Sequence, residues 1–95
     1  MFEWDPRKAA VNADKHGVTF DVAATVFADP AALDGPDLAH SAAEARFLRL
    51  GRDIEGQVLM VAYTVRKGDD NAEKIRLISA RRASRRERAA YDAQD

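Results

Sequence analysis

Two stretches in the C-terminal half, residues 57–66 and 74–81, constrain the fold of this chain more than any other feature. Both are rich in β-branched and other apolar residues and lie between polar segments, which predicts a β-strand at each. The first carries apolar residues on both of its alternating sides, so it is predicted to be a central strand covered on both faces. Residues 67–73 contain Gly68, two aspartates and an asparagine, which favour a turn and make the pair a hairpin.

Each of these predicted strands is followed directly by an arginine, Arg66 after the first and Arg81 after the second. A buried strand is a rigid mount for a side chain at its end. We therefore expect the sheet to present these two cations at its rim.

The segments before the hairpin predict two helices. Asp5 is placed to cap a helix that starts at Pro6 and stops at Gly17, where glycine accepts a left-handed conformation. Thr19 is placed to cap a second helix that packs on the sheet and ends at Asp29-Pro30. Residues 31–43 stay ambiguous, since 31–33 fit an edge strand and 34–37 fit a turn.

Residues 44–50 are predicted as a further strand, and Ser84 with Glu87 forms a capping box that opens a last helix through Tyr91. Residues 1–4 are a short extended start. The resulting order of strand, helix, helix, optional strand, three strands and helix predicts an α+β fold. Its centre is a twisted antiparallel meander of three to four strands, backed by the helices on one face.

Composition excludes several classes of protein. Ninety-five residues predict a single domain spanning 1–95. The absence of cysteine excludes disulfides, and with two histidines a structural zinc site is not expected. No apolar run reaches the roughly 20 residues of a membrane span, and the N-terminus lacks a signal peptide, so we expect a cytoplasmic protein with no membrane contact.

Charge is distributed unevenly along the chain. Residues 1–43 hold three Lys/Arg against seven Asp/Glu, whereas residues 44–91 hold twelve against seven. A basic second half fits a polyanion or an acidic protein as partner. A solvated arginine-rich helix explains the same charge, and from charge alone it is the first explanation.

Several phrases together resemble the BrnT family of type II toxins, over nearly the whole chain. They are Phe2-x-Trp4-Asp5-x-x-Lys8-Ala9-x-x-Asn12-x-x-Lys15-His16-Gly17-Val18, Val26-Phe27-x-Asp29-Pro30, Glu44-x-Arg46, Tyr63-Thr64-x-Arg66, Ile75-Arg76-x-Ile78-Ser79-Ala80-Arg81-x-Ala83 and Glu87-Arg88-x-x-Tyr91. The resemblance implies a RelE-like fold and a ribonuclease that blocks translation. It also implies a cognate ribbon-helix-helix antitoxin, similar to BrnA, through which alone the complex would bind operator DNA.

RNA cleavage without a metal or other cofactor needs a base for the 2′-OH, cations for the phosphorane and an acid for the leaving oxygen. Arg66 and Arg81 are the expected phosphate clamp, because the planar guanidinium binds phosphate bidentately. The alternative is that they form salt bridges with Glu44 or Glu87. Arg46 is a weaker third member that positions the substrate, or else a solvated edge charge.

His16 is the expected acid or base, because histidine titrates near neutrality. Its position equally fits a cap at the C-terminus of the helix. The helix dipole favours a cation there, and this explanation is preferred for His16 and for Lys15. His40, in a polar loop without a companion, is a weaker alternative. Lys15, Arg76 and Tyr91 complete the expected RNA contacts, although a tyrosine this late in a helix more often packs in a core.

The sequence therefore predicts a metal-independent endoribonuclease that cleaves mRNA, on the ribosome or free. A rival from another class is a non-catalytic basic module that binds RNA or a protein. It stays open because no residue is an unmistakable general base.

Overall fold

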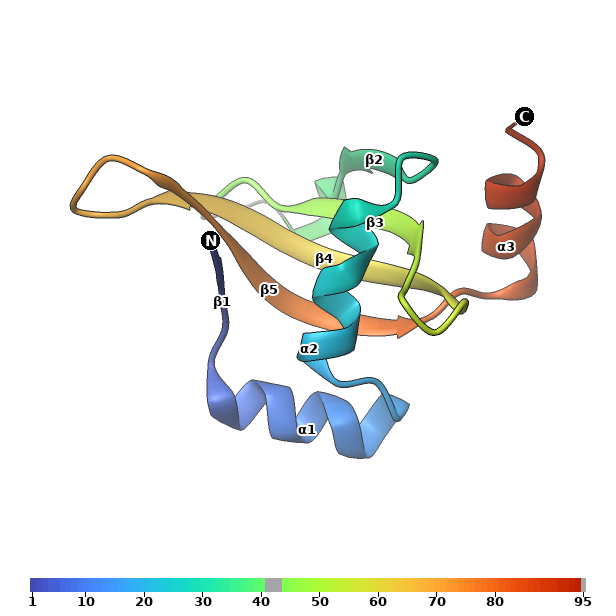
Figure 1. The fold of residues 1–95 in the computed structure, drawn as a ribbon, viewed down its shortest axis with the longest axis horizontal. Helices are drawn as coiled ribbons and strands as arrows, with labels where there is room; N and C mark the ends of the chain where they lie inside the picture. The colour runs from blue at the N-terminus through green and yellow to red at the C-terminus, as the bar shows by residue number, and fades with distance from the viewer. Residues whose placement is uncertain (41–43, 95) are drawn as a thin grey trace.

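The computed structural model describes residues 1–40 and 44–94, which build one five-stranded sheet with helices packed against it (Figure 1). The spatial order of the strands is β1-β5-β4-β3-β2. In the part of the chain that is described, no helix is long and apolar enough to cross a membrane.

The predicted meander is confirmed as the centre of this sheet. β3 (Phe47–Arg52), β4 (Val58–Lys67) and β5 (Glu73–Arg82) pair antiparallel in succession. Leu59 and Val61 are fully buried on one side of β4, while Val58 and Ala62 are buried on the other. β4 is thus the central strand covered on both faces that its apolar sequence predicts.

Two strands extend the meander at its edges. β2 (Leu33–Pro36) pairs antiparallel with β3, so the ambiguous segment does contain an edge strand, but this strand lies mostly on the stretch expected to be a turn and not on 31–33. The residues 41–43 of that segment lie outside the described residues. β1 (Phe2–Glu3) pairs in parallel with β5, which makes the sheet mixed rather than wholly antiparallel. A strand of two residues carries no pattern from which its direction could be predicted.

Both N-terminal helices begin where their capping residues predict. α1 (Pro6–His16) is capped by Asp5 and ends at Gly17, whose φ of 69° is the left-handed conformation expected there. α2 (Phe20–Ala23) starts after Thr19 and continues as the 3₁₀ helix η1 (Ala24–Ala28). Together they cover one face of the sheet and bury a core with β4 and β5, made of Val18, Phe20, Ala23, Val26, Leu59, Val61, Tyr63, Leu77 and Ala80.

Asn12 fastens α1 to the edge of β5 that β1 leaves uncovered. Its side-chain amide donates to the carbonyl of Ala80 at 2.9 Å and accepts the N–H of Ala80 at 3.1 Å. The same amide nitrogen donates to the carbonyl of Val18 at 3.0 Å. One buried side chain therefore replaces a missing strand partner and fixes the path of the chain after α1.

The C-terminal helix α3 (Arg85–Asp92) opens with the predicted capping box of Ser84 and Glu87. The expectation that all helices back one face is wrong for α3, which stands at one end of the sheet (Figure 1). Its Tyr91 packs against Leu50 and Val58, which point away from the N-terminal helices. In the described part of the chain, this placement leaves most of that second face without an α-helix.

Candidate functional site

The face of the sheet opposite α1 and α2, which we call the open face, gathers arginines from several elements. Leu59, Val61 and Tyr63 belong to the helix-covered core, so the alternating β4 side chains from Met60 through Arg66 lie on the open face. On β5, Ser79 and Arg81 pair with Ala62 and Met60 and share that face.

A β-bulge at Ile78 adds Arg76 to the same face. The register shifts between Ala62, which pairs with Ser79, and Tyr63, which pairs with Leu77, so Ile78 is the extra residue. Strict alternation from Arg81 would turn Arg76 toward the helices. Because the bulge resets the alternation, Arg76 stands opposite Thr64 on the open face.

A cavity of about 380 Å³, the open-face pocket, lies at the α3 side of this face. Its lining includes two cations, two carboxylates and an imidazole; the residues are Asp37, His40, Arg46, Leu48, Met60, Ala62, Ser79, Arg81 and Glu87. The structure thus brings together the predicted Arg46 and Arg81. It joins to them His40, the weaker alternative of the two histidines.

Arg81 is held in a bidentate pair with Glu87. Its two terminal nitrogens donate to Glu87 Oε1 at 2.8 Å and Oε2 at 2.9 Å. Hydrogen bonding to Arg81 lowers the pKa of Glu87 to about 2, with a further contribution from the Ser84 N–H. The same bonds raise the pKa of Arg81. The charged forms of both groups are therefore favoured over the whole physiological range.

His40 is held by Asp37 at the other side of the open-face pocket. The 3₁₀ turn η2 (Leu38–His40) places His40 Nδ1 3.2 Å from both carboxylate oxygens of Asp37. The N–H of Asp37 donates to the carbonyl of Arg46 at 2.8 Å, which fixes this turn beside β3. An imidazole held through Nδ1 by a carboxylate presents Nε2 for proton transfer.

Arg66 lies on the open face but at its opposite end. β4 and β5 run antiparallel, and Arg81 pairs with Met60. Met60 lies six residues before Arg66 on β4. At the rise of a strand this separates the two arginines by roughly 20 Å. They do not form one clamp on a single phosphate, since an antiparallel hairpin places the ends of its two strands at opposite edges.

Both arginines at that end pair with carboxylates. Arg66 lies 3.7 Å from Glu44, and Arg76 lies 3.2 Å from Glu3. The alternative weighed from the sequence, in which Arg66 and Arg81 pair with Glu44 and Glu87, is therefore present in the structure. These are partly exposed pairs, which a phosphate can displace at modest cost.

His16 and Lys15 lie in a different cavity, a groove of about 330 Å³ between α1 and β5. Its lining also contains Arg7, Lys8, Val11, Asn12, Ile78 and Ser79. Ser79 lines both this groove and the open-face pocket, so the two adjoin along β5. The pair is thus near the open face without sharing the pocket of Arg46 and Arg81.

Tyr91 is buried in the small core under α3 at 7% exposure. Its hydroxyl donates to Asp29 Oδ2 at 2.6 Å, and Arg52 covers the ring at 5.4 Å from its centroid. The bond to Asp29, helped by burial, raises the pKa of Tyr91. A ring enclosed in this way has no free face on which a base can stack.

Sequence reasoning underweighted His40 and treated Glu87 only as a cap and a possible salt-bridge partner. The spacing of Asp37 and His40, three residues apart, was the available signal for a carboxylate-bound histidine. This spacing indicates a site only together with the fold, which brings η2 over the sheet beside Arg46.

The comparison with protein families and the comparison with solved structures point to the same family. Residues 4–87 match the family model described as "Ribonuclease toxin, BrnT, of type II toxin-antitoxin system". The crystal structure of the Brucella abortus ribonuclease toxin, BrnT, superposes with a TM-score of 0.65 at 25% identity. That match covers 90% of this chain and 99% of the Brucella chain. No curated protein matches the sequence.

Proposed function

Because the chain belongs to the BrnT family of ribonuclease toxins of type II toxin–antitoxin systems, we propose that it cleaves mRNA in the open-face pocket without a metal ion. The observation that carries this proposal is the convergence of Arg46, Arg81 and His40 on one cavity. The two cations can stabilise the phosphorane and the imidazole can take the 2′-OH proton, which are two of the three requirements of metal-free phosphodiester cleavage.

The cleavage step is an attack by the ribose 2′-oxygen on the adjacent phosphorus. Nε2 of His40 removes the 2′-OH proton, and Asp37 stabilises the imidazolium that forms. The new P–O2′ bond forms as the P–O5′ bond breaks. The leaving 5′-oxygen takes a proton from water, and the His40 imidazolium returns its proton to the solvent. The products are a 2′,3′-cyclic phosphate and a 5′-hydroxyl end.

Arg81 and Arg46 stabilise the negative charge of the phosphorane. Arg81 is 43% exposed in its side chain although it pairs with Glu87, so part of its guanidinium faces the solvent. Glu87 is the less suitable base, because a carboxyl whose pKa is about 2 binds a proton weakly near neutrality. Its role is to hold Arg81 in position by the bidentate pair.

The other cations of the open face serve binding rather than chemistry. Arg66 and Arg76 lie along the sheet from the pocket, where they contact phosphates of the flanking RNA strand. Lys15 and His16 lie across Ser79, and Lys15 contacts RNA that leaves the pocket over the edge of β5. We assign the proton transfer to His40 and not to His16, because His40 lines the pocket that contains Arg46 and Arg81.

The available donors support the proposed metal independence. The described residues contain no group of three or more His, Asp or Glu side chains placed to hold a metal ion. The arginines supply the positive charge that a metal ion would otherwise supply.

The test compares two histidine variants of the purified protein on an RNA oligonucleotide. We expect His40→Gln to lower kcat by about 10²–10⁴-fold and to remove one limb of the pH profile. His16→Gln serves as the matched control and should retain kcat. Fragments should end in 2′,3′-cyclic phosphate, and a chelator should have no effect.

Equal kcat for the folded His40→Gln protein and the wild type would overturn the assignment. Loss of activity on adding the chelator would overturn metal independence. Wild-type protein that binds RNA without cleaving it, with or without ribosomes, would support the non-catalytic module instead.

We also propose that a ribbon-helix-helix antitoxin, similar to BrnA, inhibits the chain by covering the open face with acidic side chains. Arg66, Arg76 and Arg81 already pair with carboxylates of their own chain, so carboxylates of a partner suit the same cations. The complex would reach operator DNA through the antitoxin alone. Co-purification of the adjacent reading frame's product, and weaker capture by Arg66→Glu, test this assembly.

A further inference from the structure

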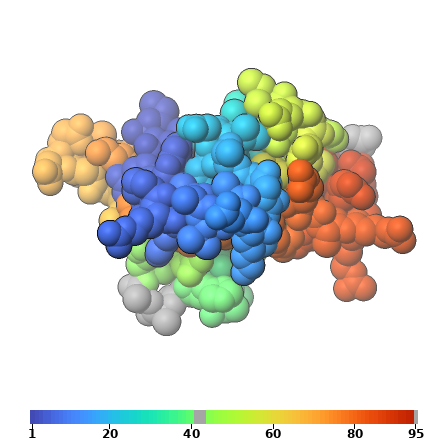
Figure 2. All heavy atoms as spheres, turned by 90° about the horizontal axis from the view of Figure 1, so that it is seen from below, coloured from blue at the N-terminus to red at the C-terminus, as the bar shows by residue number. Residues whose placement is uncertain are grey.

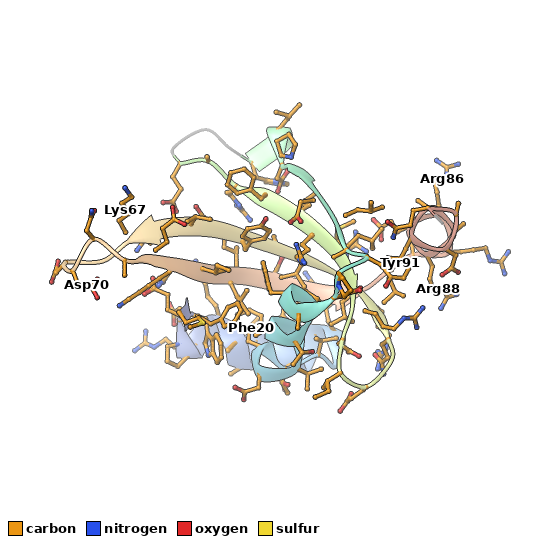
Figure 3. All side chains as sticks on the ribbon, turned by 45° about the horizontal axis from the view of Figure 1, so that its top comes forward. Phe20, Lys67, Asp70, Arg86, Arg88 and Tyr91 are labelled. Atoms are coloured by element: carbon orange, nitrogen blue, oxygen red, sulfur yellow. The ribbon has the colours of Figure 1, made fainter. Side chains whose placement is uncertain are left out.

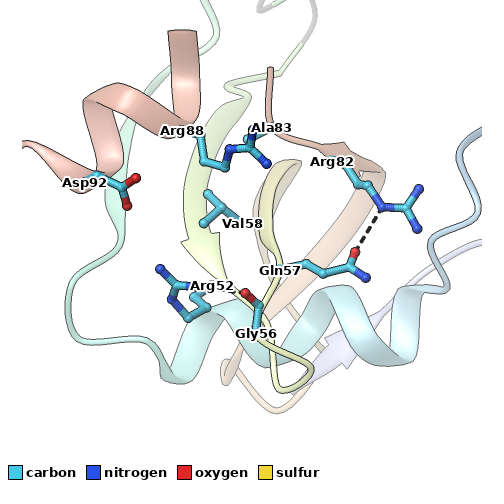
Figure 4. A pocket seen from close by; sticks show the side chains of 8 residues that line it. All are labelled: Arg52, Gly56, Gln57, Val58, Arg82, Ala83, Arg88 and Asp92. Atoms are coloured by element: carbon cyan, nitrogen blue, oxygen red, sulfur yellow. Dashed lines mark hydrogen bonds between the residues drawn. The ribbon is translucent and has the colours of Figure 1, made fainter. Parts of the chain in front are cut away.

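A further basic cavity, the end pocket, lies at the end of the sheet beside α3 (Figure 4). It measures about 510 Å³ and is lined by Arg52, Gly56, Gln57, Val58, Arg82, Ala83, Arg88 and Asp92. Arg52 and Arg88 reach it from different sides of Val58, and Arg82 stands at its rim (Figure 4). The three arginines come from β3, α3 and β5, so the fold and not one charged segment assembles them.

None of these arginines forms an ion pair with a carboxylate of the described residues. Arg52 donates to the carbonyl of Gly56 at 2.7 Å. Arg82 donates to Gln57 Oε1 at 3.1 Å and to a backbone carbonyl of α1 at 3.4 Å. The guanidinium of Arg88 forms no hydrogen bond or ion pair with any other residue in the described ranges 1–40 and 44–94.

This pattern differs from that of the open face. There Arg66, Arg76 and Arg81 each pair with a carboxylate. In the end pocket, neutral oxygens orient Arg82, and a carbonyl oxygen together with the Tyr91 ring orients Arg52, so neither charge is neutralised by an ion pair among the described residues. Asp92 is the one carboxylate in the lining, and it forms no ion pair among the described residues. A site with three cations and one anion attracts a further anion.

The end pocket adjoins the open-face pocket along the strands. Val58 and Ala83 lie two residues beyond Met60 and Arg81, a strand rise of roughly 7 Å. α3 borders both cavities and contributes Glu87 to one and Arg88 to the other. A strand of RNA that passes α3 from the open-face pocket therefore meets the end pocket next.

We propose that the end pocket binds a phosphate of the RNA strand outside the bond that is cleaved, with Arg52 and Arg88 as its ligands and Arg82 at the rim. The proposal rests on the proposed ribonuclease function, since the position beside the cleavage pocket selects RNA over other polyanions. Guanidinium groups suit this role because they remain charged and match the oxygens of a phosphate.

The test measures binding of a fully 2′-O-methylated oligonucleotide of about ten nucleotides, which cannot be cleaved, by fluorescence anisotropy. We expect Arg88→Gln and Arg52→Gln to weaken binding about fivefold to tenfold, and to reduce the salt slope by about 0.7 per lost phosphate contact. Asp92→Asn should tighten binding, because it removes the negative charge from the lining. Circular dichroism checks that each variant is folded.

Arg86→Gln is the matched control on the same helix, since Arg86 and Arg88 project to opposite sides of α3 (Figure 3). Both residues are exposed, so neither change removes core packing. Arg86→Gln should bind the oligonucleotide as the wild type does. Equal affinities for Arg88→Gln and Arg86→Gln would overturn the proposal.

Two further results separate this proposal from its premise. Weaker binding of polyglutamate but not of RNA by Arg88→Gln would assign the pocket to an acidic protein and overturn the RNA site. Weaker binding of RNA by Arg88→Gln in a protein that cleaves no RNA would support the end pocket while refuting the ribonuclease function. With a dinucleotide substrate, too short to span both pockets, Arg88→Gln should cleave at the wild-type rate.

Discussion

The carboxylate of Glu87 binds both terminal nitrogens of Arg81, at 2.8 and 2.9 Å, and its Oε1 also accepts the N–H of Ser84 at 2.8 Å. One side chain therefore closes the capping box of α3 and holds a cation of the open-face pocket. The position of α3 and the orientation of Arg81 are coupled through this carboxylate. A change at Glu87 is expected to affect stability and activity together.

Acid should weaken the fold through Glu87. Its pKa is about 2 in the folded chain and near 4.5 without these contacts, so its contribution is complete above pH 4.5 and is lost as the pH falls toward 2. Glu87→Gln should lower the free energy of unfolding at pH 7 by about 1–2 kcal/mol. Urea unfolding at several pH values measures both effects.

The pH dependence is the control within this experiment. The difference in stability between wild type and Glu87→Gln should shrink between pH 4.5 and pH 2. A difference that stays constant over that interval would show that the pair contributes nothing through its charge.

Asn12 should be one of the most sensitive polar positions in the chain. Asn12→Ala leaves the N–H and carbonyl of Ala80 and the carbonyl of Val18 without their buried partner. We expect a loss of about 2–4 kcal/mol in the free energy of unfolding, measured by denaturant titration. The neighbouring Val11 is 64% exposed, so Val11→Ala is the control and should change stability by less than about 0.5 kcal/mol.

Both tyrosines should resist ionisation in the folded protein. Burial, with the hydrogen bond to Asp34, raises the pKa of Tyr63 from 10 to about 12. The bond to Asp29 raises that of Tyr91 in the same direction. In the native protein, the absorbance of tyrosinate should therefore appear only at pH values well above 10. In denaturant it should appear near pH 10.

Because the pKa of Tyr63 is raised in the folded protein, its ionisation lowers the stability of the fold at high pH. The Tyr63 contribution is complete below pH 10 and is lost as the pH rises toward 12. Native and denatured titration curves that coincide would contradict the buried, hydrogen-bonded positions of these hydroxyls.

Local sequence signals predicted most of the elements and their limits. The caps at Asp5, Thr19 and Ser84 marked the helix starts, and the apolar pattern of β4 identified the central strand. These features depend on neighbours in the chain, so they can be read without the fold. The side of the sheet that α3 occupies depends instead on the packing of Tyr91, which its helical position alone does not determine.

The site was harder to predict because it depends on register. Arg66 and Arg81 both end strands, yet the hairpin separates them, while the bulge at Ile78 brings Arg76 onto their face. A single extra residue in a ladder has no reliable sequence signal. His40 joins the pocket through a turn held by Asp37, a contact between segments that periodicity does not address.

Arg66 should affect substrate binding rather than the chemical step. Since it lies roughly 20 Å along the strand from the level of Arg81, Arg66→Gln should raise KM several-fold and leave kcat within about twofold of wild type. Steady-state kinetics on an RNA oligonucleotide that spans the open face gives both constants. A fall in kcat as large as that caused by Arg81→Gln would place the reaction at the wrong end of the sheet.

The most direct measurement is the single-turnover cleavage rate of Arg81→Gln at saturating RNA, with Arg81→Lys and Arg86→Gln alongside. The account predicts a fall of about 10²–10³-fold for Arg81→Gln and partial recovery for Arg81→Lys, which keeps the charge without the fork. Arg86→Gln should cleave as the wild type does. If folded Arg81→Gln cleaves within about twofold of the wild-type rate, RNA is not cleaved in the open-face pocket.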